Sequence, residues 1–173
     1  MSDYLILSDT HGKGALASLV LSRQIRRPDA LLFAGDGLRD IYAMDVPTVY
    51  AVKGNCDGYP RLLLLNGQSE AVPEERVFYA EDKKIFLLHG HTRQVKHGLG
   101  AAIGRAVELD ADAIVFGHTH MPICYTLETG NADYGVTLKK PLCVFNPGSL
   151  AFGGSFGTLT VRSGQMLFSH GSI

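Results

Sequence analysis

Five short segments of this chain carry Asp, Asn or His directly after an apolar run. They are Asp9-Thr10-His11, Gly35-Asp36, Gly54-Asn55, His89-Gly90-His91 and Gly117-His118-Thr119-His120. Carboxylate and amide oxygens combined with imidazoles suit Mn²⁺, Fe or Zn²⁺, and Ni²⁺ less exclusively. The segments together offer more such ligands than one metal ion can use. The sequence therefore predicts a site that holds two ions.

The apolar runs before these segments have the length and composition of buried strands. They are residues 4–7, 30–34, 48–52, 85–88 and 113–116. In open α/β sheets, ligands bind beyond the carboxyl ends of the strands, so five such ends would place these side chains in one polar cup. His118 and His120 are two residues apart. On an extended backbone both would project to the same side, where each could reach a different ion. Asp9 and His11 have the same spacing and geometry.

Two ions about 3.5–4 Å apart need a bridging anion to offset their repulsion, and a central carboxylate usually supplies it. Asp36 is the candidate, because the preceding Gly35 lets the backbone approach closely. A hydroxide shared by the two ions would then attack phosphorus in line. The positive charge of the ions would stabilise the transition state of that attack.

The rest of the chain predicts elements that would hold this cup in place. Residues 15–27 have near-helical apolar spacing with arginines at the end, and Pro28 would close that helix. A β-hairpin is expected over residues 76–88 and a second helix over residues 98–109. Four further strands are expected at 123–127, 142–145, 157–161 and 166–169. Two facing sheets with helices outside follow from this order.

Composition narrows the class of protein. The 173 residues fit a single domain over residues 1–173, and 46% of them are hydrophobic, which is ample for a core. The net charge of -1 does not fit a surface for long nucleic acid, so a small substrate is expected. No apolar run approaches the roughly 20 residues of a membrane helix, and the N-terminus does not resemble a signal peptide. Three cysteines without metal-finger spacing favour a reduced, cytoplasmic protein.

Taken in order, the five segments resemble the ligand motifs of the calcineurin-like metallophosphoesterases. The Gly54-Asn55-Cys56-Asp57 variant, Asn146-Pro147-Gly148-Ser149 and the chain length are similar to the small prokaryotic phosphodiesterase branch of that superfamily. The resemblance extends from Tyr4 to about Val161. It implies a four-layer α/β/β/α sandwich of two facing mixed sheets with helices outside. It also implies a dinuclear metal-dependent phosphodiesterase that acts on a small phosphodiester.

The resemblance also assigns the ligands. One ion would be held by Asp9, His11, Asp36 and His120. The other would be held by Asp36, Asn55, His89 and His118. The cofactor expected is a pair of divalent ions, with Mn²⁺ favoured and Fe, Zn²⁺ or Ni²⁺ as alternatives. The oligomeric state stays open, although small members of such families often pair.

The chain departs from the family pattern at Cys56. Many members carry a His there, which is thought to protonate the leaving group, and a thiol with an ordinary pKa near 8.5 is a poor substitute. His91 is a candidate replacement, although it could equally orient a neighbouring ligand, and Asp57 is a weaker candidate. Asn55 and Cys56 are also candidate substrate-binding residues. Specificity is expected from the pocket walls, including residues 56–59 and the segments near His91 and Phe152.

A second function class stays open on the same fold. A eukaryotic retromer subunit has this fold but has largely given up turnover and works as a protein-interaction scaffold. Loss of ligands would favour that alternative, and here no ligand position is lost. The missing acid histidine keeps it under consideration.

Overall fold

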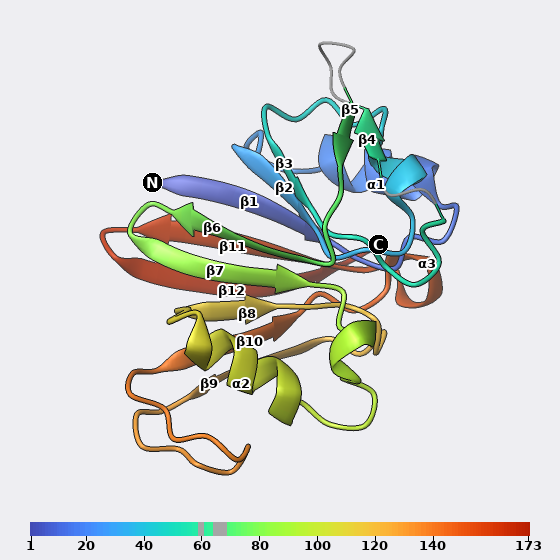
Figure 1. Cartoon of the computed structure of the whole chain (residues 1–173). Coiled ribbons are helices and arrows are strands. Elements are labelled where there is room, and N and C mark those ends of the chain that lie inside the picture. The colour runs from blue at the N-terminus through green and yellow to red at the C-terminus, as the bar shows by residue number, and fades with distance from the viewer. Residues whose placement is uncertain (59–60, 64–68) are drawn as a thin grey trace.

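Two five-stranded mixed sheets face each other in the computed structural model, which describes residues 1–58, 61–63 and 69–173 (Figure 1). The first sheet has the strand order β12-β11-β1-β2-β3. Its strands are β1 (Ser2–Leu7), β2 (Ala30–Phe33), β3 (Val49–Ala51), β11 (Ser155–Arg162) and β12 (Gln165–Ser172). β1, β2 and β3 run parallel, and the C-terminal hairpin of β11 and β12 adds to β1 in the antiparallel sense.

The second sheet has the order β6-β7-β8-β10-β9. Its strands are β6 (Glu75–Ala80), β7 (Lys83–Leu88), β8 (Ala113–Val115), β9 (Ile123–Leu127) and β10 (Leu142–Asn146). β7, β8 and β10 run parallel, while the two edge strands are antiparallel to their neighbours. A separate hairpin of β4 (Arg61–Leu63) and β5 (Ser69–Ala71), which the sequence analysis did not predict, completes the strands.

Helices cover the outer faces of the sheets. They are α1 (Gly14–Ser22), α2 (Gly100–Glu108) and α3 (Leu150–Gly153), with single 3-10 turns η1 (Leu38–Ile41) and η2 (His91–Arg93). The expectation of a helix over residues 15–27 was wrong in its extent. The Gln24 side chain donates to the carbonyl of Val20, and the helix ends at Ser22. Ile25 beyond it is fully exposed.

Alternation along the strands separates the core into three layers. Ile6 of β1 and Leu87 of β7 point into the space between the sheets. Their neighbour Leu7 faces the α1 side of the first sheet, and Phe86 faces the α2 side of the second. Because side chains alternate across a strand, each sheet buries both faces. The predicted four-layer sandwich is confirmed.

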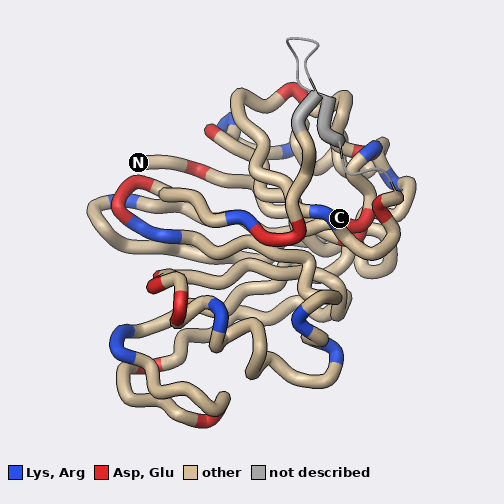
Figure 2. Tube along the Cα trace, in the orientation of Figure 1, with Lys and Arg blue, Asp and Glu red and all other residues tan. Residues whose placement is uncertain are grey.

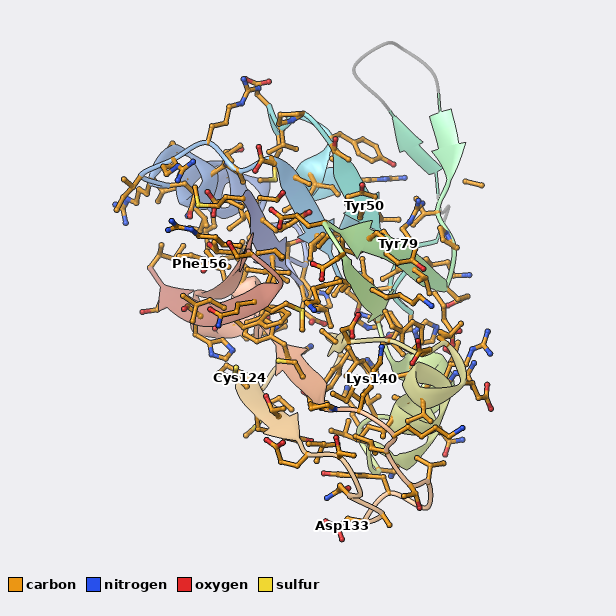
Figure 3. The ribbon with its side chains drawn as sticks, turned by 90° about the vertical axis from the view of Figure 1, so that its left-hand side faces the viewer. Tyr50, Tyr79, Cys124, Asp133, Lys140 and Phe156 are labelled. Atoms are coloured by element: carbon orange, nitrogen blue, oxygen red, sulfur yellow. The ribbon has the colours of Figure 1, made fainter. Side chains whose placement is uncertain are left out.

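The two sheets place their carboxyl ends on the same side of the molecule (Figure 1). Their edge strands β3 and β6 also meet, where Tyr50 stacks on Phe78 with ring centroids 4.2 Å apart. Figure 3 shows Tyr50 and Tyr79 on these two neighbouring strands. The loops that follow β1, β2, β3, β7 and β8 therefore converge at one edge.

Charges of both signs are interspersed along the chain trace, as Figure 2 shows. This distribution agrees with the net charge of -1. Within the described residues, no helix combines the length and the apolar character needed to cross a membrane.

Candidate metal centre

All seven residues that the sequence analysis proposed as metal ligands meet at this edge. Asp9 and His11 follow β1, Asp36 follows β2 and Asn55 follows β3; His89 follows β7, and His118 and His120 follow β8. Asp9, Asp36 and His89 are buried, with side chains 0–3% exposed. The four others are half-buried or exposed. The cup therefore has a buried floor and an open rim.

A first cluster consists of Asp9, His11 and His120, whose candidate ligand atoms all lie within 4.8 Å of one another. Asp9 Oδ1 is 3.1 Å from His120 Nε2 and 3.9 Å from His11 Nε2. The other oxygen, Oδ2, accepts hydrogen bonds from Ser8 Oγ and from the backbone N–H of His118. These bonds fix the carboxylate and leave Oδ1 facing the two imidazoles.

A second cluster consists of Asp36, His89 and His118, again within 4.8 Å. Asp36 Oδ2 lies 3.4 Å from His89 Nε2 and 3.8 Å from His11 Nε2, so this carboxylate stands between the clusters. His89 Nε2 is also 3.1 Å from His118 Nδ1 and 3.2 Å from Asn55 Oδ1. On its far side His89 Nδ1 donates to the carbonyl of Ala34. That bond leaves the lone pair of Nε2 pointing into the cup.

The backbone at these positions is unusual. Asp9, His11, Asp36, His118 and His120 all have φ between 40° and 64°. The expectation of an extended backbone at the two Asp/His pairs was therefore wrong, because these four residues adopt left-handed conformations instead. A left-handed conformation costs a non-glycine residue about 1–2 kcal/mol, so the surrounding contacts must hold these turns in place.

Two glycines allow the loops to touch. A Cβ atom on Gly54 would collide with Asp36 Oδ1, and one on Gly117 would collide with Ser8 Oγ. Any side chain at either position would push apart loops from different strands. The glycines of the Gly-Asn and Gly-His motifs thus permit the close approach that the ligand residues need.

Asp57 binds the loops through its carboxylate. Oδ2 accepts from the backbone N–H groups of Asp36 and Gly54, and Oδ1 accepts from those of Gly37 and Leu38, all at 2.8–2.9 Å. Both oxygens are therefore committed to four backbone donors. This arrangement suits an ionised carboxylate that joins the loop after β2 to the loop after β3.

Two further side chains, whose roles were not predicted from the sequence, hold the loops of the cup in place. Asp40 accepts from Thr10 Oγ1 and from Gly12 N–H, which holds the loop around His11. The fully buried Asn146 donates to the carbonyl of Gly117 and to Thr119 Oγ1. The Asn146-Pro147-Gly148-Ser149 motif had drawn attention to this segment of the sequence. No local pattern marked Asp40.

The charges of the cup shift the pKa values of its members. Burial raises the pKa of Asp36, but His89 and the N–H of Cys56 outweigh it and hold that pKa well below its usual range. Burial lowers the pKa of His89, but the carboxylates of Asp36 and Asp9 raise it by more, so the pKa of His89 is raised overall. Burial and the neighbouring His89 lower the pKa of His118 to about 4. The imidazole of His118 is therefore neutral at pH 7, as a metal ligand must be.

His91 and Cys56 flank the cup. The ring of His91 lies 5.4 Å from that of His89, and its Nε2 is 3.3 Å from Glu74 Oε2. Burial and His89 lower the pKa of His91 despite this carboxylate. Cys56 is exposed, and its sulfur accepts from Asn55 Nδ2. Partial desolvation of the sulfur, together with Asp36, raises the pKa of its thiol. Tyr59, at the end of the expected 56–59 pocket wall, lies outside the described residues.

The donor set of the cup fits divalent metal ions. Asp9 Oδ1 and His11 Nε2 are buried and have no hydrogen-bond partner among the described residues. Buried polar atoms without a partner are costly unless a ligand satisfies them. A cation between Asp9, His11 and Asp36 would satisfy both atoms, and the O/N donors are those expected for Mn²⁺, Fe or Zn²⁺.

Comparison with known proteins agrees with this geometry. Residues 3–164 match the calcineurin-like phosphoesterase superfamily domain. A probable metallophosphoesterase, YsnB of Bacillus subtilis, is 29% identical over 146 residues, which are 84% of this chain and 73% of that protein. A predicted phosphoesterase from Streptococcus pneumoniae has a similar structure, with TM-score 0.71, 23% identity and coverage of 99% and 89% of the two chains.

Vacuolar protein sorting 29 from Cryptosporidium parvum also shares the fold, with TM-score 0.67, 18% identity and coverage of 99% and 97% of the two chains. The fold therefore occurs both in proteins named as phosphoesterases and in one named for protein sorting. The family match over nearly the whole chain and the cup of metal-ligand side chains lead to one conclusion. This chain is a member of the calcineurin-like phosphoesterase superfamily.

Proposed function

We propose that this protein is a dinuclear metal-dependent phosphodiesterase. The observation that carries the proposal is the placement of Asp36 between two ligand clusters, one with His11 and one with His89. A carboxylate in that position can bridge two cations and offset their repulsion. In the proposed assignment Asp9, His11 and His120 complete one ion site. Asn55, His89 and His118 complete the other.

When bound, the ions would supply an activated water as nucleophile and positive charge for the phosphoryl oxygens. The protein residues prepare the site for them. Ser8 and the N–H of His118 orient Asp9, and the carbonyl of Ala34 orients His89. Asp57 is best assigned a positioning role, because four backbone donors occupy its carboxylate and hold Asp36 in place.

His91 is the proposed donor of the proton to the leaving group. Its ring stands beside that of His89, and the Glu74 carboxylate offsets part of the lowering of its pKa by burial and His89. If His91 has this role, His91→Gln should slow hydrolysis of esters with poor alkoxide leaving groups much more than hydrolysis of p-nitrophenyl esters. Equal slowing of both would assign His91 to orientation of its neighbours instead.

A small diester is the proposed substrate class. A cavity of about 550 Å³ opens beside the cup and is lined in part by His11, Asp36, Cys56 and Arg39. Arg39 is the only Lys or Arg among the described residues that line it. A diester carries one negative charge and a monoester carries up to two, so a single arginine besides the ions suits the diester. Mn²⁺ is the favoured metal, with Fe, Zn²⁺ and Ni²⁺ as alternatives.

The test uses the purified full-length chain loaded with Mn²⁺. It should hydrolyse bis-p-nitrophenyl phosphate, and chelation or His118→Ala should abolish that hydrolysis. A matched control is His97→Ala, which changes a histidine outside the cup. Full hydrolysis by the metal-free protein would contradict the proposal.

A protein-interaction scaffold is the second candidate, because sorting proteins share the fold and Cys56 occupies the position of the family's acid histidine. Retention of every ligand position argues against it. A stable protein partner recovered by the intact chain, together with no bound metal and no hydrolysis across a diester panel, would favour this candidate.

A cytoplasmic location is also proposed. The three cysteines are free thiols, which suits a reducing compartment.

A further inference from the structure

Phe152 is an exposed aromatic ring at the rim of the metal centre. Its side chain is 72% exposed. The ring stacks on His120 with centroids 5.1 Å apart and planes at 18°, and it lies 5.3 Å from the ring of His11. The chain contains eight phenylalanines, and the other seven are buried or half-buried. Phe152 is therefore the one exposed phenylalanine of the chain, and it lies beside the polar cup.

The backbone of α3 is bound to the segment that carries Asp9. Ser149 Oγ accepts from the N–H of Phe152 and donates to the carbonyl of Asp9. The next two amides bind the same segment, since Leu150 N–H donates to the carbonyl of Ser8 and Ala151 N–H to that of Asp9. The backbone of Phe152 is thus tied to the segment of a candidate metal ligand, and a preorganised binding surface requires such support.

One face of the Phe152 ring is covered and the other is open. The stack on His120 covers the first face of the ring. Because Phe152 is largely exposed, the second face is in contact with solvent. Since the open face points away from His120, a ring carried by a substrate in the cup would meet Phe152 at the exposed edge of its ring rather than on that face. Aromatic pairs favour edge-to-face contacts as well as offset stacks, and both are worth more than the burial of their area alone.

We propose that Phe152 is a specificity-determining residue, which binds an aromatic or heteroaromatic ring carried by the substrate close to its phosphorus. The inference rests on the proposed function, because the metal centre must bind the phosphoryl oxygens. It narrows the substrate class to phosphodiesters with such a ring on an ester oxygen. Small alkyl diesters bind the same metal centre without this contact.

Binding of two inert phosphonates tests the inference without turnover. Phenylphosphonate and methylphosphonate are titrated into the Mn²⁺-loaded chain by calorimetry, since they differ only in the group on phosphorus. The wild type should bind phenylphosphonate about three- to tenfold more tightly, the range expected for one aromatic contact. Phe152→Ala should remove that preference, and Phe152→Tyr should keep it.

The matched control is Tyr79→Ala, which removes an exposed aromatic ring on β6 (Figure 3). It should leave both affinities unchanged. Metal analysis should give equal metal content for Phe152→Ala and the wild type, which separates ring binding from loss of a ligand. An unchanged preference in Phe152→Ala, or parallel weakening of both phosphonates, would overturn the inference.

Hydrolysis of methyl p-nitrophenyl phosphate by the same preparations separates this inference from the proposed function. A phenyl preference that depends on Phe152, in a protein that hydrolyses no diester, would support ring binding while overturning the phosphodiesterase proposal. Hydrolysis without any dependence of phosphonate preference on Phe152 would do the reverse.

Discussion

The two sheets contribute different chemistry to the metal centre. The strand ends of the first sheet supply Asp9, Asp36 and Asn55, together with the imidazole of His11. The strand ends of the second sheet supply imidazoles only, from His89, His118 and His120. The first half of the cup is therefore anionic, and the second half is neutral once its histidines are deprotonated.

This difference shows why the cup needs both sheets. The carboxylates supply the negative charge that two cations require, and imidazoles complete the ligand shells without adding charge. Each cluster also crosses the sheet boundary, since Asp9 meets His120 and Asp36 meets His89. Metal bound in the cup would thus link the two sheets. Its removal should therefore lower both the activity and the stability of the protein.

The largest effect is expected for the residue between the clusters. Asp36→Asn keeps the shape but removes the charge that would bridge the ions, so diester hydrolysis should fall on the order of a thousandfold. Steady-state kinetics at saturating Mn²⁺ measure this, with the exposed Asp82→Asn as the matched control. Near-normal activity in Asp36→Asn would contradict the assignment of Asp36 as the carboxylate that joins the two clusters.

Single ligands from opposite halves should affect different ions. His11→Ala should lose the ion of the first cluster and His118→Ala that of the second, so each should retain about one Mn²⁺ per chain. Both should lose about a hundredfold or more in activity. Metal analysis after dialysis gives the count. Loss of the same single ion in both variants would contradict the division into two clusters.

A substitution at Asp57 tests whether the half of the cup built by the first sheet depends on how its loops are held. Asp57→Asn leaves some of its four backbone donors without an acceptor, which should lower the free energy of unfolding by about 2–3 kcal/mol. Metal affinity should fall about tenfold to a hundredfold, because Asp36 is no longer held. Urea unfolding and Mn²⁺ titration measure the two effects. Unchanged stability would show that the four bonds contribute little.

A carboxylate away from the cup should behave differently. Asp112 accepts from Lys84 N–H and from Lys140 Nζ, so both of its oxygens have partners. Burial raises its pKa, but Lys140 and the Lys84 N–H outweigh burial and lower it overall. A lowered pKa stabilises the fold above the unfolded value of about 4, and this contribution is lost as pH falls through the folded value.

Asp112→Asn should therefore cost about 1 kcal/mol of unfolding free energy at pH 7, since the side chain is 22% exposed. The difference from the wild type should shrink below pH 4 and should not respond to Mn²⁺ at any pH. Urea titrations with and without Mn²⁺ check both statements. A difference that stays constant down to pH 3 would refute the assigned role of the charge.

The sequence predicted the strand ends well because apolar runs and polar stops are local patterns. The runs before Asp9, Asp36 and His118 mark both the strands and the edge where their ends meet. The left-handed turns at these residues were not predictable, since their cost is offset by contacts distant in sequence. The four bonds of Asp57 and the stack of Phe152 on His120 also depend on segments that only the tertiary structure brings together.

The number of Mn²⁺ ions bound per chain, followed while bis-p-nitrophenyl phosphate is hydrolysed, tests the central claim most directly. Stripped protein is titrated with Mn²⁺, and bound metal and hydrolysis are recorded at each step. The proposed dinuclear site predicts two ions per chain and hydrolysis that reaches its maximum only as the second site fills. A single bound ion at full activity, or hydrolysis before any ion binds, would contradict the account.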